Sequence, residues 1–204
     1  MTPFEKWYIP LLFVQILISI AIFVVTALAV NTWWKQINYG KERQVSDKLW
    51  MLCDRCALLF SEARDREFFL RLDTKVAGFE SINGEEKILF WALYSPYHTL
   101  NTGFHVFDEL DTTSIEAKHV LGVDVMNNVS ELKKLRNQIM NSSIRIVDLK
   151  FGPSPTSEEK IEELEIEVHE SILFSSKNDK INIDISKNIE SIRGSLLARK
   201  VMNP

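Results

Sequence analysis

The stretch YIPLLFVQILISIAIFVVTALAV, residues 8–30, decides how the rest of the chain is interpreted. From Ile9 to Val30 it contains no charged residue. At about 1.5 Å of rise per residue, a helix over this run is about 33 Å long, enough for a hydrocarbon core of about 30 Å. A core helix of a soluble domain rarely has apolar side chains on every face over such a length. The run therefore predicts a transmembrane helix.

Aromatic side chains lie at both margins of this run. Trp7 and Tyr8 stand at its start, and Trp33 and Trp34 follow its end. Amphipathic rings of this kind gather at headgroup depth on both sides of a bilayer. We therefore expect these four residues to mark the two membrane interfaces.

A cleaved secretory signal peptide is the main alternative. Ala27-Leu28-Ala29 forms an A-x-A cleavage motif, and cleavage there would leave a periplasmic helical domain. However, Glu5 offsets Lys6 in the leader, and the apolar run exceeds the roughly 7–15 residues usual for a signal peptide. An uncleaved anchor is the preferred interpretation.

Flanking positive charges predict the orientation of the anchor. Only Lys6 precedes the run, whereas four basic residues follow it closely: Lys35, Lys41, Arg43 and Lys48. Positive residues favour the cytoplasmic side. We expect a single-pass protein of the inner (cytoplasmic) membrane, with its N-terminus outside and its C-terminal domain in the cytoplasm.

One face of the anchor is less apolar than the rest. Its members recur at intervals of four, three, four and three residues: Gln15, Ser19, Ile22, Thr26 and Ala29. Small and polar residues on one face let membrane helices approach and form interhelical hydrogen bonds. This pattern predicts a homo-oligomer held by the transmembrane helix, although Ser, Thr and Ala are also common in such helices. A role of Gln15, Ser19 and Thr26 in lining a lumen is a narrower hypothesis.

The composition of the whole chain bounds its class. Of 204 residues, 46% are hydrophobic and 25% charged, which is typical of a globular protein, and the net charge of −4 gives no sign of binding a nucleic acid polymer. We expect four segments: a tail and transmembrane helix (1–34), a juxtamembrane connector (35–45), a helical cytoplasmic domain (46–143) and a C-terminal α+β element (144–204). The predicted fold class is mainly α.

Apolar spacing of three and four residues predicts helices from about Ser46, over 68–79, and over a long segment that opens with a capping box from Thr113 to Glu116. Gly40 is a possible break in the connector, and Pro96 is expected to break or kink its segment into two short helices. The long helix should bury a seam in which Asn128 is the polar member, formed by Leu121, Val125, Leu132, Leu135 and Ile139.

Beyond Ser143 the pattern changes toward alternation. Segments 144–152 and 180–185 are predicted as strands, with a helix capped at Thr156 between them and a final helix from about Ser186. Residues 164–168 fit either a helix or a strand.

No catalytic motif is present. The chain has no glycine-rich phosphate loop, no G-x-S-x-G and no H-E-x-x-H. Cys53 and Cys56 form a lone C-x-x-C inside a helical pattern, which indicates two small core residues rather than a zinc site. His98, His105, Asp108 and Glu109 are the best metal candidates, but a bundle site needs ligands from several helices. We expect no metal, no cofactor and no enzyme activity.

Four basic residues form the best candidate for ligand binding: Arg64, Arg66, Arg71 and Lys75. Arginine binds phosphate groups well, so an anchored enzyme or nucleotide-binding module is the alternative function. Interleaved acidic residues are equally typical of a solvated helix face. The acidic stretch 158–170 is a candidate surface for a protein partner.

The expected function is that of a non-enzymatic sensor, scaffold or effector that acts through oligomerisation at the membrane. This plan of one anchor and a small cytoplasmic domain is similar to that of small single-pass bacterial proteins, including candidates for stress response and phage defence. No short motif carries that similarity.

Overall fold

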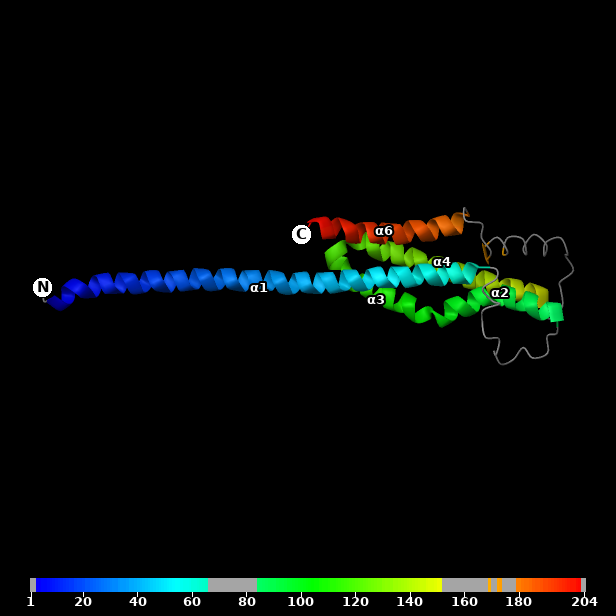
Figure 1. The fold of residues 1–204 in the computed structure, drawn as a ribbon, viewed down its shortest axis with the longest axis horizontal. Helices are drawn as coiled ribbons and strands as arrows, with labels where there is room; N and C mark the ends of the chain where they lie inside the picture. The colour runs from blue at the N-terminus through cyan, green and yellow to red at the C-terminus, as the bar shows by residue number, and fades with distance from the viewer. Residues whose placement is uncertain (1–2, 66–83, 152–168, 170–171, 174–178, 203–204) are drawn as a thin grey trace. The chain divides into compact units, whose positions relative to one another are not determined.

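The computed structural model describes residues 3–65, 84–151, 169, 172–173 and 179–202. These ranges contain helices and no strand. The helices are α1 (Pro3–Arg64), α2 (Gly84–Thr102), α3 (Phe104–Leu121), α4 (Val123–Phe151) and α6 (Lys180–Met202), as Figure 1 shows. The chain divides into two compact units, Met1–Gln44 and Val45–Pro204, and α1 contributes residues to both.

The first unit consists of the N-terminal part of α1. Every side chain from Leu12 to Gln36 is exposed. The predicted break at Gly40 is wrong, because α1 continues through this residue to Arg64. A single glycine in a helix costs only about 1 kcal/mol relative to alanine, which is too little to end a long helix.

The second unit is a helical bundle in which α4 packs against α2, α3 and α6. The C-terminal part of α1 completes it, because one face of this helix lies in the hydrophobic core: Leu49, Leu52, Cys53, Cys56, Phe60 and Ala63. The rings of Phe60 and Phe107 meet edge to face, with centroids 5.5 Å apart. The spacing of three and four residues identified this core face correctly.

Glycines, and not the predicted signals, separate α2, α3 and α4. Pro96 lies inside α2, and the Ser95 hydroxyl donates to the Ala92 carbonyl, which Pro96 has no N–H to satisfy. The helix ends only before Gly103. The predicted capping box is also wrong, since Thr113 is buried inside α3.

Gly122 ends α3 and precedes α4. Its φ of +91° lies in the region that favours glycine, and its N–H donates to the Lys118 carbonyl. The long helix therefore begins at Val123, ten residues after the predicted cap.

Both predicted strands are wrong. Residues 144–151 are the last two turns of α4, and 181–185 begin α6. In α6 the buried residues follow the spacing of a helix and not of a strand: Ile181, Ile185, Ile189, Ile192 and Leu196. Ile183, which the strand pattern needed on the same face, is 54% exposed. The C-terminal α+β element is therefore not seen in the described residues.

The predicted seam of α4 is largely correct. Val125, Leu132 and Ile139 are fully buried and Leu135 is half-buried, whereas Leu121 is the last residue of α3 and is not part of this helix. Asn128 lies at the edge of this seam, and its side-chain amide donates to the Ser191 hydroxyl of α6 at 2.9 Å. The predicted helices over 68–79 and after Thr156, together with segment 164–168, fall outside the described residues.

Candidate functional site

The first candidate site is the apolar part of α1. Its most apolar 18-residue window has a mean hydropathy of 2.7, and none of that window is buried. By length and composition this helix can cross a membrane, and a signal sequence near an N-terminus meets the same two criteria. Trp33 and Trp34 are each 59% exposed. The side chains of Trp7 and Tyr8 lie outside the described set.

The less apolar face of the anchor, called the stripe below, is exposed along α1. It consists of Gln15, Ser19, Ile22, Thr26 and Ala29. The Ser19 hydroxyl donates to the Gln15 carbonyl at 2.9 Å, and the Thr26 hydroxyl donates to the Ile22 carbonyl at 2.8 Å. These bonds satisfy the hydroxyl protons within the helix, as is usual for Ser and Thr in helix interiors. The side-chain amide of Gln15 is the strongest polar group left on this face.

A shallow hollow runs beside the N-terminal half of the stripe. It has a volume of about 480 Å³ and is bordered by Leu12, Ile16, Ile20 and Phe23, with Gln15 and Ser19 in its lining. The small Ser19 side chain between larger neighbours lets another helix approach the backbone closely.

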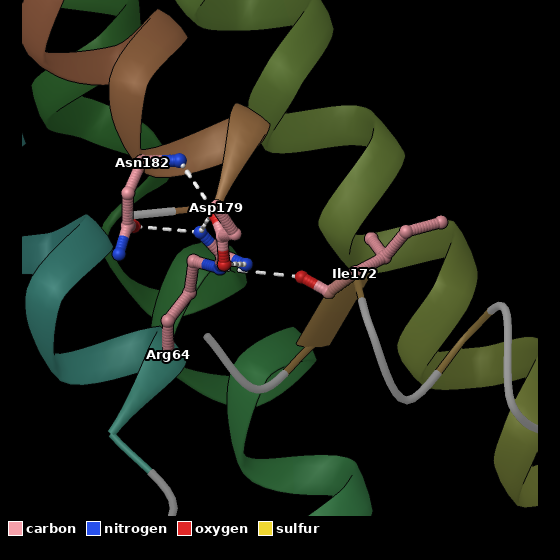
Figure 2. A network of polar contacts seen from close by, with 4 residues as sticks. All are labelled: Arg64, Ile172, Asp179 and Asn182. Carbon is pink, nitrogen blue, oxygen red and sulfur yellow. Dashed lines mark hydrogen bonds and ion pairs between the residues drawn. The ribbon is translucent and has the colours of Figure 1, made fainter. Parts of the chain in front are cut away.

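The second candidate site is a polar clasp between the end of α1 and the start of α6, which Figure 2 shows. Arg64 donates from Nη1 and Nη2 to the two carboxylate oxygens of Asp179, at 3.1 and 2.8 Å. Its Nη1 also donates to Asn182 Oδ1 at 2.6 Å, and its Nε donates to the Ile172 carbonyl at 3.2 Å. The Arg64 side chain is only 2% exposed, so this bidentate ion pair is largely removed from water.

Asp179 also caps α6. Its Oδ1 accepts a hydrogen bond from the Asn182 N–H at 2.7 Å, and its carbonyl accepts the N–H of Ile183. An aspartate at this position satisfies free N–H groups of the first turn and suits the positive end of the helix dipole. The same carboxylate therefore starts α6 and fixes it to α1.

A second polar contact joins α6 to α1 about three turns earlier along α1. Arg193 binds the carboxylates of Asp54 and Glu190, and its guanidinium lies 5.5 Å from the centre of the Trp50 ring. Between this contact and the clasp is a groove of about 470 Å³, whose apolar floor includes Phe60, Ile185 and Ile189.

The charged groups around this groove disfavour the predicted phosphate ligand. Arg64 and Arg193 face four carboxylates in or beside the groove, those of Asp54, Asp65, Asp179 and Glu190. Four hydrogen bonds from Arg64 already go to protein groups, so little of its guanidinium is left for a phosphate. The other three residues of the prediction, Arg66, Arg71 and Lys75, lie outside the described ranges, as does the acidic stretch 158–170.

Sequence reasoning missed Asp179, Asn182 and Arg193. An Asp directly before Lys180 is a standard N-cap signal, and it would have placed the start of the helix correctly. No comparable signal pairs Arg64 with Asp179, because the two residues are 115 positions apart.

The two cysteines are fully buried in the core and are free thiols. Burial raises the pKa of Cys53 to about 12 and raises the pKa of Cys56 as well. Both are therefore protonated at neutral pH, and a protonated thiol is a poor nucleophile and a poor metal ligand.

The weak metal candidates are not brought together. Glu109 forms an ion pair with Lys48 at 2.8 Å, a hydrogen bond that lowers the pKa of Glu109 and raises the pKa of Lys48. Within the described ranges no three His, Cys, Asp or Glu side chains are placed to hold a metal ion. The chain matches no family model, no curated protein and no solved structure.

Proposed function

We propose that this chain is a single-pass membrane protein whose helical domain acts in the cytoplasm as a sensor, scaffold or effector, through association of its anchors. The observation that carries the proposal is the apolar surface of α1, which is exposed from Leu12 to Val30 and which its own fold leaves uncovered. Exposed apolar surface of this extent is unfavourable in water and favourable in lipid. The Lys and Arg excess after Val30 supports an outside N-terminus.

Association through the stripe is supported by its chemistry. Gln15 offers an amide that finds no better partner in lipid than the same group of a neighbouring helix. Ser19 and Ala29 are small enough to let two backbones come close. A signal received by the domain would then change how the anchors pack, or a change in the packing of the anchors would alter the domain.

The experiment replaces Gln15, Ser19 and Thr26 together with Leu in the full chain. Each interhelical hydrogen bond is worth about 0.6 kcal/mol on average and rarely above about 1.7 kcal/mol, so the triple change should lower the dimer population several-fold. Insertion should persist, since Leu favours lipid more than the residues it replaces. Chemical crosslinking in membranes reads the oligomeric state.

The matched control is Leu17→Ala with Leu28→Ala, two changes off the stripe that should alter crosslinking less. If the stripe variant crosslinks like the unmodified chain, the helix is only a tether, and the proposed oligomerisation is wrong.

A further inference from the structure

The part of α1 that follows the apolar run is basic and aromatic, and its first acidic residue is Glu42. Trp33 and Trp34 are each 59% exposed, and the side chains of Lys35 and Lys41 are exposed as well. Within the part of the chain that the structure describes, neither lysine has an ion pair or a hydrogen bond from its side chain. Both ammonium groups are therefore available to a partner outside the chain.

We propose that this juxtamembrane segment, residues 33–41 of α1, binds the phosphate groups of anionic phospholipids in the membrane that holds the anchor. This inference rests on the proposed function, because it assumes that the apolar run is inserted. Lysines that directly follow a membrane span lie beside the headgroups, and anionic lipid attracts such basic residues. The lipid surface is therefore the partner that fits both the charge and the place of this segment.

The continuity of α1 gives the two lysines fixed positions relative to the indoles. The helix passes through Gly40 without a break, so Lys41 remains on the same helix as Trp34. These two residues are seven positions apart, which places them on one face at a separation of about 10 Å along the axis. With the indoles at headgroup depth, Lys35 lies in the headgroup layer and Lys41 lies just beyond it.

The direction of the side chains brings both ammonium groups closer to the lipid. In an α-helix the Cα–Cβ bonds tilt toward the N-terminus, which in α1 is the end that carries the apolar run. The long stem of lysine can extend along the helix while its charge stays in a polar layer. The headgroup layer is about 5–7 Å thick on each side of the bilayer, so Lys41 can reach it from above.

Quenching of tryptophan fluorescence by brominated lipids tests this contact in the full chain. The protein is reconstituted into vesicles with equal amounts of phosphatidylcholine, which is zwitterionic, and phosphatidylglycerol, which is anionic. One lipid or the other carries bromine on its acyl chains, so the ratio of the two quenching signals measures which lipid gathers around Trp33 and Trp34. Both leaflets have the same composition, so the orientation of the anchor does not affect the result.

The test variant is Lys35→Gln with Lys41→Gln, and the matched control is Lys133→Gln with Lys134→Gln, which removes the same charge from α4. The other tryptophans are the same in all three proteins. We expect brominated phosphatidylglycerol to quench the unmodified chain and the control more strongly, with a several-fold enrichment of the anionic lipid. The test variant should lose most of this enrichment, and high salt should reduce it in the unmodified chain.

Three results would overturn the inference. Equal quenching by the two lipids in the unmodified chain, or an enrichment that persists in the Lys35→Gln, Lys41→Gln variant, overturns the lipid contact and leaves the anchor intact. An equal loss in the control variant assigns the effect to net charge and not to this segment. No quenching by either brominated lipid shows that the apolar run is not inserted, which overturns the proposed function as well.

Discussion

Arg64, the last residue of α1, donates to both carboxylate oxygens of Asp179, the residue that caps α6. The arginine side chain is 2% exposed and the aspartate side chain 22% exposed. A bidentate, largely buried pair of this kind fixes the relative position of two helix ends more tightly than apolar packing alone. This contact joins the last residue of α1 to the residue that starts α6.

Asp179→Ala should therefore destabilise the protein strongly. The change leaves the Arg64 charge buried without its partner, which typically costs about 3–5 kcal/mol. Asp179→Asn should cost less, because asparagine still caps a helix and accepts one hydrogen bond. Denaturant unfolding of the detergent-solubilised full chain measures both.

Glu131→Ala is the matched control for this prediction. It removes the exposed ion pair with Lys134, and pairs of that type are worth about 0–1 kcal/mol. An Asp179→Ala variant no less stable than Glu131→Ala would show that the clasp contributes little.

Two glycines should respond to alanine in opposite directions. A Cβ at Gly103 would come within 2.6 Å of Leu59 Cδ1, so the Leu59 side chain must leave its rotamer, and Gly103→Ala should cost about 0.5–1.5 kcal/mol. Gly194 lies inside α6 with no neighbouring atom within 4 Å of an added Cβ. Gly194→Ala should therefore stabilise by about 0.5–1 kcal/mol. Thermal unfolding of the two variants side by side decides the sign of each.

The buried cysteines predict a loss of stability at alkaline pH. The pKa of Cys53 is raised to about 12 in the fold, whereas an unfolded thiol ionises near pH 9. The stabilisation is therefore fully present below about pH 9 and is lost as the pH rises toward 12. The double variant Cys53→Ala with Cys56→Ala should lack this part of the pH dependence.

That double variant should also stay folded at neutral pH. Two such truncations leave modest cavities and should cost about 1–2 kcal/mol in total. Zinc in the purified protein, or loss of activity in a folded double variant, would contradict a purely structural role. An unchanged alkaline unfolding profile would contradict the assignment of the pH dependence to these thiols.

Much of the fold could be predicted from local spacing. The core face of α1 and most of the α4 seam follow from apolar residues three and four apart, a pattern that a helix alone produces over many turns. Short apolar runs do not distinguish a strand from a helix. Ile181 and Ile185 fit both a strand and a helix, and only the continuation through Ile189 and Ile192 distinguishes the two.

The end of α2 and the partners of Arg64 could not be predicted from the local sequence. The sequence predicts a break or kink at Pro96, but α2 continues through it to Thr102, because a helix can bend around a proline when the free carbonyl finds another donor. The partner of Arg64 depends on how α6 packs against α1, and that is a property of the whole bundle. The stripe of the anchor follows from the spacing of its residues alone.

Topology fusions test the orientation of the anchor. The excess of Lys and Arg after Val30 predicts that a C-terminal alkaline phosphatase is inactive and that a C-terminal fluorescent protein is bright. Lys35, Lys41 and Arg43 are the first three basic residues after the apolar run. Their joint replacement with Gln should weaken the bias, whereas the same change at Lys133 and Lys134, far along the chain, should leave it unaltered. An active phosphatase on the unmodified chain would show that the C-terminus lies outside, which contradicts the predicted orientation.

The mass of the N-terminus in the membrane fraction tests the central claim most directly. After expression of the full chain, membranes are washed with alkaline carbonate and the retained protein is analysed by intact mass spectrometry. The account predicts a carbonate-resistant protein that keeps residues 8–30. A mature chain that begins at Val30 and is released into the soluble fraction would contradict it.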